Sequence, residues 1–457
     1  MIRWSSLILC CLWGLADFAA AADRPNIVFI LADDLGYTDV GWHQSEIRTP
    51  HLDALAAQGA RLEQFYVQPV CSPTRAALMT GRYPMRHGLQ VGVVRPWAQY
   101  GLPLEERTLP RALAEAGYET AIVGKWHLGH FRPEYLPMSR GFTHQYGHYN
   151  GAIDYWTHIR DGGFDWHRDQ KECRDEGYST ALLGTEAVRL IREHQPTKPL
   201  FLYIPFNAPH SPLQAPEEFL ERYAHLTPKN RRTYAAMVSC LDEQVGRIVA
   251  ALDETGMRQN TLIIFSSDNG GPLGSGATNG ELRDGKGSVY EGGVRVPAFA
   301  VLPGRVPAGI AVHEPLHMVD WYPTLLQLAG APLEQELALD GHNLWPVLTQ
   351  GQPTPHVEIL HNTAPLGGAL RRGDWKLVIH EGGQKAQGSP QLELFHIPKD
   401  IRESNNLAEQ EPERVASLLA RYRELAAEAL PPKATDRSPK GFQAPRVWGE
   451  SPRESVP

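Results

Sequence analysis

Four short apolar runs, each followed at once by polar residues, constrain the fold of this chain more than any other feature. The runs read NIVFIL, TAIV, PLFLYI and TLIIF, and helical patterns separate them along the sequence. Short runs that are rich in branched side chains are typical of buried parallel strands. The sequence therefore predicts an α/β fold with a parallel sheet.

Polar side chains follow all four runs, in positions that do not suit a core. They are Asp33 and Asp34 after the first run, Lys125 and His127 after the second, Asn207 and His210 after the third, and Asp268 and Asn269 after the fourth. The carboxyl ends of parallel strands form one common edge, which is where such folds place their sites. Each pair taken alone is equally consistent with a polar loop start or a helix cap. The four together predict one functional site.

Four members of this set offer only oxygen ligands. Asp33, Asp34, Asp268 and Asn269 include no thiolate and no imidazole. Hard oxygen ligands favour calcium or magnesium over zinc. The two adjacent aspartates can both reach one ion only if the backbone leaves the regular strand there, which the following LGY permits. Calcium is the expected ion, because its looser geometry tolerates an irregular set of ligands.

A cysteine stands at the start of the segment CSPTRAALMTG, which predicts a short helix that ends at glycine. Cys71 and Arg75 are four residues apart, so on a helix they share one face near its positive N-terminal end, which stabilises an anion. Cys71 is then either a nucleophile with a low pKa or a packed thiol. Neither interpretation accounts for a nearby metal held by oxygen, because a thiol is a poor ligand for calcium.

The first residues have the features of a secretory signal. Arg3 precedes an apolar stretch from Leu7 to Leu15, and Ala20 and Ala22 have the spacing of a cleavage site. We expect residues 1–22 to be removed, leaving no membrane anchor, because the apolar stretch is shorter than the roughly 20 residues that a spanning helix needs. No Asn-x-Ser/Thr sequon occurs in the sequence, which favours an exported bacterial protein, periplasmic or secreted.

The sequence changes in character after about residue 350, which suggests a second structural unit. GALRRGDWKLVIHEGG and QLELFHI predict antiparallel strands, and EPERVASLLARYRELAAEAL predicts a helix with one apolar face. We expect a large domain that carries the site over residues 23–354, a C-terminal α+β subdomain over residues 355–435, and a mobile tail rich in proline and arginine over residues 436–457.

Composition excludes several classes of protein. The chain has 457 residues, of which 42% are hydrophobic and 21% charged, so it is neither disordered nor fibrous. Its formal net charge of -8 argues against nucleic acid as a partner. Removal of the signal leaves Cys71, Cys173 and Cys240, too few for a disulfide framework. Cys173 and Cys240 either pair with each other or remain free thiols.

Taken together, these residues resemble the sulfatase family. CSPTR followed by AALMTG, and GYETAIVGKWH at residues 117–127, match its two signatures, and DNGG, NAPHSPLQAP and GKGSVYEGG match further motifs. The likeness covers most of residues 24–300. The segment WHLGHFRPEYLPMSRGFTHQYGHYNGAIDYWTH is most similar to the arylsulfatase B branch, which removes the 4-sulfate of N-acetylgalactosamine residues in glycosaminoglycans. After Lys286, however, GSVY stands where that branch carries bulkier aromatic residues, so the identity of the substrate stays open.

The resemblance implies a fold and a modified residue. The fold is an alkaline-phosphatase-like sandwich with a large mixed, mostly parallel sheet flanked by helices, plus a smaller C-terminal domain with a short antiparallel sheet and a helix. Cys71 would be oxidised to formylglycine by a formylglycine-generating enzyme during maturation, and the hydrate of this aldehyde would be the nucleophile. Once sulfated, the hydrate keeps a second hydroxyl that can expel sulfate, so turnover does not require water to attack sulfur.

The family's roles also carry over to individual residues. Arg75 would hold the oxygens of the hydrate, and Lys125 and Lys286 would bind the sulfate. His210 would protonate the departing alcohol oxygen, and His127 would help to remove the proton of the hydrate during sulfate release. The calcium ligands would be Asp33, Asp34, modified Cys71, Asp268 and Asn269.

The activity expected from the resemblance is hydrolysis of sulfate monoesters, either of sulfated carbohydrates or of aryl sulfates. Two alternatives remain: a phosphomonoester, phosphodiester or phosphonate hydrolase built on the same sheet, and a binder of sulfated glycans without turnover, if Cys71 is not converted.

Two local expectations concern the chain around and after Lys125. If this segment is extended, Lys125 and His127 both face the site and Trp126 faces away. The aromatic and histidine-rich stretch that follows either lines the mouth of a sugar pocket or packs on itself as a surface lid. It contains His144, His148, Tyr149, Tyr155, Trp156, His158 and Trp166.

Overall fold

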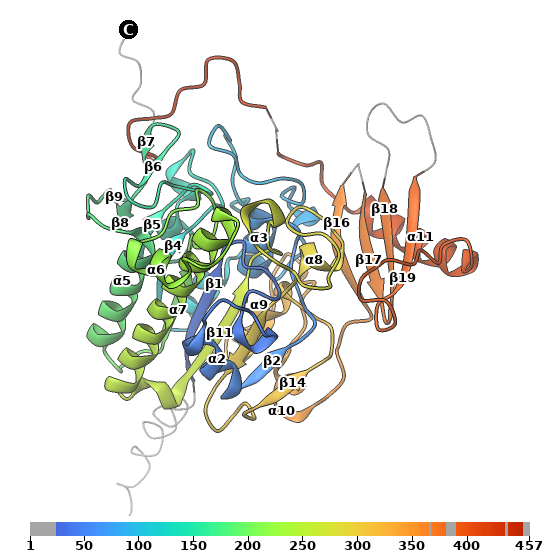
Figure 1. Ribbon diagram of the computed structural model, residues 1–457, viewed down its shortest axis with the longest axis horizontal. Coiled ribbons are helices and arrows are strands. Elements are labelled where there is room, and N and C mark those ends of the chain that lie inside the picture. The colour runs from blue at the N-terminus through green and yellow to red at the C-terminus, as the bar shows by residue number, and fades with distance from the viewer. Residues whose placement is uncertain (1–23, 365–366, 381–389, 435–436, 451–457) are drawn as a thin grey trace, which may run out of the picture.

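The computed structural model describes residues 24–364, 367–380, 390–434 and 437–450 (Figure 1). The signal sequence expected over residues 1–22 lies outside the described residues. The described chain forms a large sheet with helices on both faces and, beside it, a small antiparallel sheet covered by a helix (Figure 1). The fold class expected from the sequence is confirmed.

The large sheet has ten strands in the described part of the chain, and its centre is parallel. The central strands lie in the order β11 (Thr261–Ser267), β1 (Asn26–Ala32), β10 (Leu200–Pro205), β4 (Glu119–Lys125) and β5 (His144–His148). The sheet is extended beside β11 by β13 (Ala298–Val301), β2 (Ala60–Leu62) and β14 (Ile310–Val312), and beside β5 by β8 (His167–Arg168) and β9 (Lys171–Glu172). The four apolar runs are therefore the adjacent strands β11, β1, β10 and β4.

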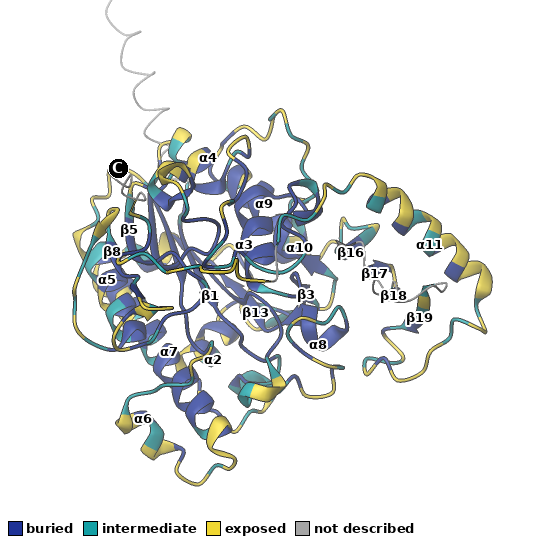
Figure 2. Ribbon diagram, turned by 90° about the horizontal axis from the view of Figure 1, so that it is seen from above, coloured by how far each residue is buried: buried dark blue, intermediate teal, exposed yellow. Residues whose placement is uncertain are grey.

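Side chains of the central strands alternate between two buried cores. In β1, Ile27, Phe29 and Leu31 pack into one core, and Val28 and Ile30 pack into the other. The first core is closed by α3 (Cys71–Thr80), α4 (Leu109–Glu115), α9 (Trp321–Leu328) and α10 (Trp345–Gln350), and the second by α2 (Pro50–Ala57), α5 (Ser179–Glu193), α6 (Glu217–Arg222) and α7 (Lys229–Glu254) (Figure 2). Each fully buried aliphatic side chain contributes about 2 kcal/mol to the free energy of unfolding, so this packing holds the ends of the strands in fixed positions.

The remaining short elements connect these layers. Two small sheets are formed by β12 (Arg295–Val296), β3 (Phe65–Tyr66) and β15 (Leu316–His317), and by β6 (Ile159–Arg160) and β7 (Gly163–Phe164). The four-residue helix α8 covers Glu291–Val294. Single turns of 3-10 helix are η1 (Gly41–His43), η2 (Pro84–Arg86), η3 (Pro133–Tyr135), η4 (Pro137–Arg140), η5 (Met257–Asn260), η6 (Leu273–Ser275) and η7 (Met318–Asp320).

The C-terminal part of the chain forms its own antiparallel sheet. The strands are β16 (Glu358–Ala364), β17 (Gly367–Arg372), β18 (Trp375–His380) and β19 (Gln391–His396), in this order. The helix α11 (Pro412–Ala427) packs Leu418 and Tyr422 onto Leu370 and Leu377 of the sheet, and its outer face is exposed (Figure 2). The antiparallel strands and amphipathic helix expected here are present, together with β16, which the sequence patterns did not indicate.

The tail after α11 returns to the large domain. In Figure 1 it crosses the upper end of the molecule and reaches β6 and β7. The backbone of Phe164 donates to Arg446 and accepts from Trp448, and Trp448 is only 3% exposed, with Nε1 donating to the carbonyl of Arg160 at 2.9 Å. Within the tail, for which composition predicts mobility, Val447 and Trp448 are buried, whereas residues 437–441 are exposed. Residues 435–436 and 451–457 lie outside the described residues.

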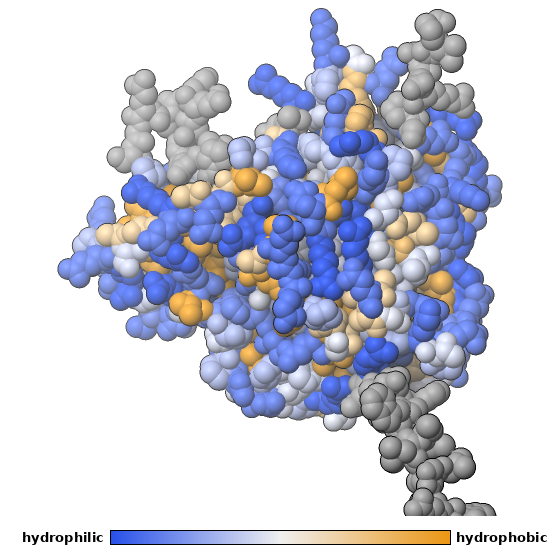
Figure 3. All heavy atoms as spheres, turned by 180° about the vertical axis from the view of Figure 1, so that it is seen from behind, coloured by the Kyte–Doolittle hydropathy of each residue, from blue (hydrophilic) through white to orange (hydrophobic). Residues whose placement is uncertain are grey.

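Other expectations concern the thiols and the surface. Cys71, Cys173 and Cys240 are all free thiols, so the expected alternative of a disulfide between the last two is not formed. Hydrophilic residues cover most of the face seen in Figure 3, and hydrophobic ones gather there only in small groups. Among the described residues, no helix is both long enough and apolar enough to cross a membrane.

Candidate active site

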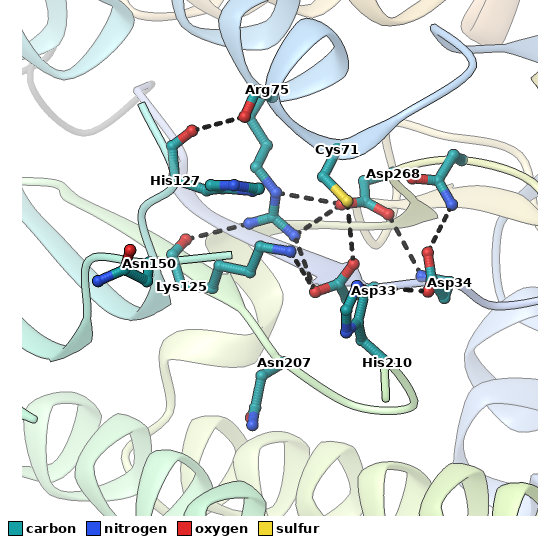
Figure 4. Close-up of polar contacts among 12 residues, drawn as sticks. Asp33, Asp34, Cys71, Arg75, Lys125, His127, Asn150, Asn207, His210 and Asp268 are labelled. Atoms are coloured by element: carbon teal, nitrogen blue, oxygen red, sulfur yellow. Dashed lines mark hydrogen bonds and ion pairs between the residues drawn. The ribbon is translucent and has the colours of Figure 1, made fainter. Parts of the chain in front are cut away.

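The predicted site residues meet at the carboxyl ends of the central strands (Figure 4). Asp33 and Asp34 follow β1, Asp268 and Asn269 follow β11, and Lys125 is the last residue of β4. The parallel registers of these strands bring their ends to one edge, as the sequence pattern predicted. His210 reaches the same place from the loop after β10, and Cys71 and Arg75 from α3.

Cys71 is the first residue of α3 and lies beside the aspartates. Its Sγ is 3.6 Å from Oδ1 of Asp33, and the side chain is 2% exposed. The helix begins at Cys71 because Val70 is extended, with φ at -146° and ψ at 164°. The unsatisfied amides and the dipole at this end of α3 therefore favour negative charge close to Cys71.

Arg75, one turn along α3, ties the helix to two strands. Its Nε and Nη2 donate to Oδ2 of Asp268 at 3.1 and 2.8 Å, and its Nη1 donates to the carbonyl oxygen of Lys125 at 3.0 Å. Nη2 also lies 3.8 Å from Oδ2 of Asp33. All these side chains are buried, so the guanidinium offsets the charge of two carboxylates that water does not reach.

Two lysines approach the remaining carboxylate oxygens. Nζ of Lys125 is 2.6 Å from Oδ2 of Asp33. Nζ of Lys286 is 2.7 Å from Oδ1 and 2.9 Å from Oδ2 of Asp34. Burial alone would raise the pKa of Asp34, but the Lys286 ammonium holds this pKa well below its usual range. The loop that carries Lys286 therefore belongs to the site, although it follows none of the four apolar runs.

The backbone turns sharply at two site residues. Asp34 has a φ of 73° and His127 a φ of 59°, both in the left-handed region that non-glycine residues seldom adopt. At Asp34 this turn allows adjacent aspartates to face the same cluster, as the sequence required. At His127 it shows that the segment after Lys125 is not fully extended, which was the condition for both Lys125 and His127 to face the site. Trp126 does face away, since it packs in the apolar core.

The two histidines of the site occupy different surroundings. Nε2 of His210 lies 3.7 Å from Oδ2 of Asp34, and burial lowers the pKa of His210 to about 3 against the opposing effect of Asp34. Nε2 of His127 is 3.0 Å from the carbonyl oxygen of Val94, and burial together with Lys125 holds its pKa well below the usual range. Nδ1 of His127 is buried without a hydrogen-bond partner among the described residues. Both imidazoles are neutral near pH 7 in this state of the protein.

Burial also affects the protonation of Cys71. It raises the pKa of the Cys71 thiol to about 12, and Asp268 acts in the same direction. The side chain is therefore a neutral thiol at pH 7 in these surroundings, whereas direct nucleophilic attack by cysteine requires a thiolate.

The donor set fits a hard divalent cation. Asp33, Asp34, Cys71 and His210 offer atoms that all lie within 4.8 Å of one another. Burial, together with the neighbouring Asp33, raises the pKa of Asp268 to about 6. Oδ1 of Asn269 is buried without a hydrogen-bond partner among the described residues, while its Nδ2 donates to Asp34 at 2.7 Å. A cation held by carboxylate and amide oxygens would satisfy this orphaned oxygen.

Some residues that the sequence singled out do not join the cluster. Asn207 points toward α5, where its Nδ2 donates to Oγ of Ser179 at 3.1 Å (Figure 4). Most of the aromatic stretch is buried, which matches a lid packed on itself; the buried members are His148, Tyr149, Tyr155, His158 and Trp166. The exceptions are Trp156, which is 47% exposed, and His144, which is half-buried.

The structure gives local roles to Tyr155, which the sequence analysis named only as a member of the aromatic stretch, and to Asn150, which it did not name. The hydroxyl of Tyr155 lies 2.6 Å from the carbonyl oxygen of Asn207 and 2.7 Å from that of His210, so it fixes the loop that carries His210. Asn150 lies on the Lys125 side of the cluster (Figure 4), and its Nδ2 donates to Asp165 at 2.9 Å. Both lie in the aromatic stretch, where nothing in the sequence pattern separates them from packing residues.

Comparisons with known proteins agree with this arrangement. A family model described as Sulfatase matches residues 25–331. Arylsulfatase J of Mus musculus is 37% identical over 94% of this chain and 81% of its own length. N-acetylgalactosamine-6-sulfatase of Rattus norvegicus is 36% identical over 77% of this chain and 71% of its own length.

Similarity extends to a solved structure, that of Ps i-CgsB in complex with k-i-k-neocarrahexaose. It is 35% identical, has a TM-score of 0.83, and the match covers 90% of this chain and 94% of that one. The family model spans well over half of the chain, and the relatives align along most of it. The chain therefore belongs to the sulfatase family and is a sulfuric ester hydrolase.

Proposed function

We propose that the protein hydrolyses sulfate monoesters of carbohydrates with a formylglycine at position 71 and one calcium ion. The observation that carries this proposal is the cluster in which Cys71, at the positive end of α3, lies 3.6 Å from Asp33 and next to the charges of Arg75 and Lys125. The raised pKa of the Cys71 thiol supports the proposal that a hydroxyl group, and not the thiol itself, is the nucleophile at this position.

Calcium is proposed to be held by oxygens of five residues: Asp33, Asp34, modified Cys71, Asp268 and Asn269. The ion would supply charge that stabilises the ionised hydroxyl of the formylglycine hydrate and the sulfate oxygens. The unpartnered Oδ1 of Asn269 and the buried carboxylates support this ligand set. His210 also lies within reach of the cluster, and we assign it to proton transfer instead.

The hydrate would supply one hydroxyl that attacks sulfur and a second that later expels sulfate. Arg75 is positioned to hold these oxygens, because its guanidinium is fixed by Asp268 and by the carbonyl of Lys125. His127 is positioned to accept a proton, because its Nδ1 is buried and has no hydrogen-bond partner among the described residues.

Lys125 and Lys286 are proposed to bind the sulfate of the substrate. Together with Arg75, a divalent cation and three aspartates, these two lysines give the site a formal charge of about +2, which attracts a sulfate monoester to an otherwise acidic protein. Fixed charges around the transferring group are the largest expected source of rate enhancement.

His210 is proposed to protonate the departing alcohol oxygen. Its imidazole is 17% exposed beside Asp34, and Tyr155 holds its loop. Because burial keeps its pKa low, protonation requires added negative charge nearby, which a bound sulfate ester provides.

A sulfated carbohydrate is the proposed substrate class, with N-acetylgalactosamine 4-sulfate as one candidate. The solved relative in complex with a neocarrahexaose and the relative named N-acetylgalactosamine-6-sulfatase support sugar sulfates. The exposed Trp156 offers an aromatic face to a sugar ring. We also propose export and maturation by a formylglycine-generating enzyme.

Rates on matched sulfate and phosphate monoesters of one alcohol test this proposal against a phosphate or phosphonate hydrolase. We expect kcat/KM to be higher on the sulfate. A clear preference for phosphate would contradict the proposal, and turnover of neither ester would favour a non-catalytic glycan binder.

A further inference from the structure

A cavity outside the candidate active site lies between the large domain and the C-terminal tail. Its volume is about 860 Å³, within the range of sites that hold small molecules or sugars. One wall consists of residues 96–99 with His130 and Phe131, and the other of tail residues 439–450. The tail therefore does more than cover the large domain, because it forms half of this cavity.

Aromatic rings dominate the lining. Phe442 packs edge-on against Trp97, with ring centroids 6.1 Å apart, and stacks on Trp448 at 6.4 Å. The ring of His130 packs edge-on against Trp448, with ring centroids 5.1 Å apart. Trp448 is buried, whereas Phe442, Trp97 and Phe131 are half-buried and present part of their surface to the cavity. Faces of this kind bind the apolar side of a sugar ring.

Exposed cations stand at the rim of the same cavity. Lys440 and Arg446 both line it and both are exposed, while Glu450 is an acidic residue of the lining. The lining thus carries two cations and one carboxylate in a chain whose net charge is -8, although Nη2 of Arg446 also lies 3.7 Å from Oε2 of Glu172 beside the cavity. Aromatic faces next to cations suit an anionic carbohydrate better than a neutral one.

The loop that forms one wall of the cavity also borders the active-site cluster. The amide of Val94 donates to Oγ of Ser72 at 3.1 Å, next to Cys71, and its carbonyl oxygen is 3.0 Å from Nε2 of His127. Two residues further on, the carbonyl oxygen of Pro96 is 3.0 Å from Nε2 of His130 in the cavity wall. The segment of residues 94–96 therefore borders both places, so the cavity is a neighbour of the active-site cluster.

We propose that this cavity is a second sugar subsite, which binds a neighbouring residue of the sulfated glycan whose sulfate is removed at Cys71. The inference rests on the proposed function for the identity of the glycan. Phe442 stacks on the sugar ring, and Lys440 and Arg446 bind its anionic groups. The enzyme should consequently prefer oligosaccharides to small sulfate esters.

The test compares Phe442→Ala and Lys440→Ala with wild type on two substrates. The probes are a sulfated hexasaccharide, either the chondroitin 4-sulfate hexasaccharide or k-i-k-neocarrahexaose, and 4-nitrophenyl sulfate, which is too small to reach the cavity. We expect Phe442→Ala to lower kcat/KM on the hexasaccharide about tenfold and to leave kcat/KM on nitrophenyl sulfate within about twofold. Arg437→Ala is the matched control, because Arg437 is an exposed cation of the tail that does not line the cavity.

Binding of the same hexasaccharides, measured by titration calorimetry, separates failure of this inference from failure of the proposed function. Loss of affinity in Phe442→Ala supports the subsite even if sulfate release is not detected, in which case only the proposed function fails. Equal affinity and equal kcat/KM in wild type and Phe442→Ala overturn the subsite and leave the proposed function standing. Absence of binding of both hexasaccharides to wild type also overturns it.

Discussion

Sγ of Cys71 lies 3.6 Å from Oδ1 of Asp33, although 38 residues separate them in the chain. The contact exists because β1 ends and α3 begins at the same edge of the sheet, where Lys125 and Arg75 supply compensating charge. The thiol is buried among carboxylates and its pKa is raised, which supports the proposed conversion of Cys71 to another group.

Replacement of Cys71 should separate activity from folding. We expect Cys71→Ala to lose at least about 10³-fold in kcat, since the nucleophile is removed, and to lose only about 1 kcal/mol of unfolding free energy, since one buried sulfur is lost. Sulfate release and thermal unfolding measure the two effects. Cys240→Ala, a buried thiol in α7, is the control and should keep full activity. Substantial turnover by Cys71→Ala would remove Cys71 from the mechanism.

The role of His210 predicts a dependence on the leaving group. His210→Ala should lower kcat/KM by about 10²-fold or more on a sugar sulfate, whose alkoxide needs a proton, and by less than about tenfold on nitrophenyl sulfate, whose phenolate does not. The ratio of the two losses is the measurement. Losses of equal size on both substrates would show that His210 does not act as the general acid.

Removal of calcium should lower both activity and stability. At a calcium concentration of about 100 Kd, binding adds about 2.7 kcal/mol to the unfolding free energy, so a chelator should lower the melting temperature and calcium should restore it. Asp34→Asn should abolish this increment. Asp242→Asn is the control, because Asp242 is buried but bonds the backbone of Leu52 and should keep the increment. A melting temperature that calcium does not change in the native protein would contradict the metal assignment.

A buried carboxyl at the junction with the C-terminal sheet predicts a pH effect on stability. Burial raises the pKa of Glu403 to about 7 against the opposing effect of Lys376, whose Nζ lies 3.0 Å from Oε1 of Glu403 and 2.9 Å from Oε1 of Glu291. The folded protein therefore binds this proton more tightly than the unfolded chain. The stabilisation that this bound proton adds to the free energy of unfolding is present at low pH. It is lost as the pH rises from about 5 to about 7.

The variant Glu403→Gln removes this titration. We expect the melting temperature of wild type to fall more steeply between about pH 5 and about pH 7 than that of Glu403→Gln. Parallel curves for the two proteins would show that the pKa of Glu403 is not raised on folding.

The central strands and the cluster at their ends were predictable because they depend on local patterns. Branched apolar runs predict β1, β4, β10 and β11, and parallel pairing alone brings Asp33, Lys125 and Asp268 to one edge. The Lys286 loop was predicted only from its resemblance to a family motif, because a lysine between glycines has no pattern of its own.

Features set by tertiary contacts were not predictable. Asn207 has the sequence position of a site residue but turns to Ser179, because α5 offers a partner there. The tail has the composition of a mobile segment, yet Trp448 anchors it, because a backbone carbonyl of Arg160 and the ring of His130 are in place to receive the indole. Neither partner is adjacent in sequence, so no local pattern reports them.

The chemical state of residue 71 tests the account most directly. Protein produced in its native host and shown to release sulfate should be digested, and the peptide that contains residues 71–75 analysed by mass spectrometry after treatment with a hydrazide reagent and with iodoacetamide. We predict a hydrazone at position 71 and little alkylated cysteine, in proportion to the specific activity. Fully alkylated cysteine in active protein would contradict the mechanism.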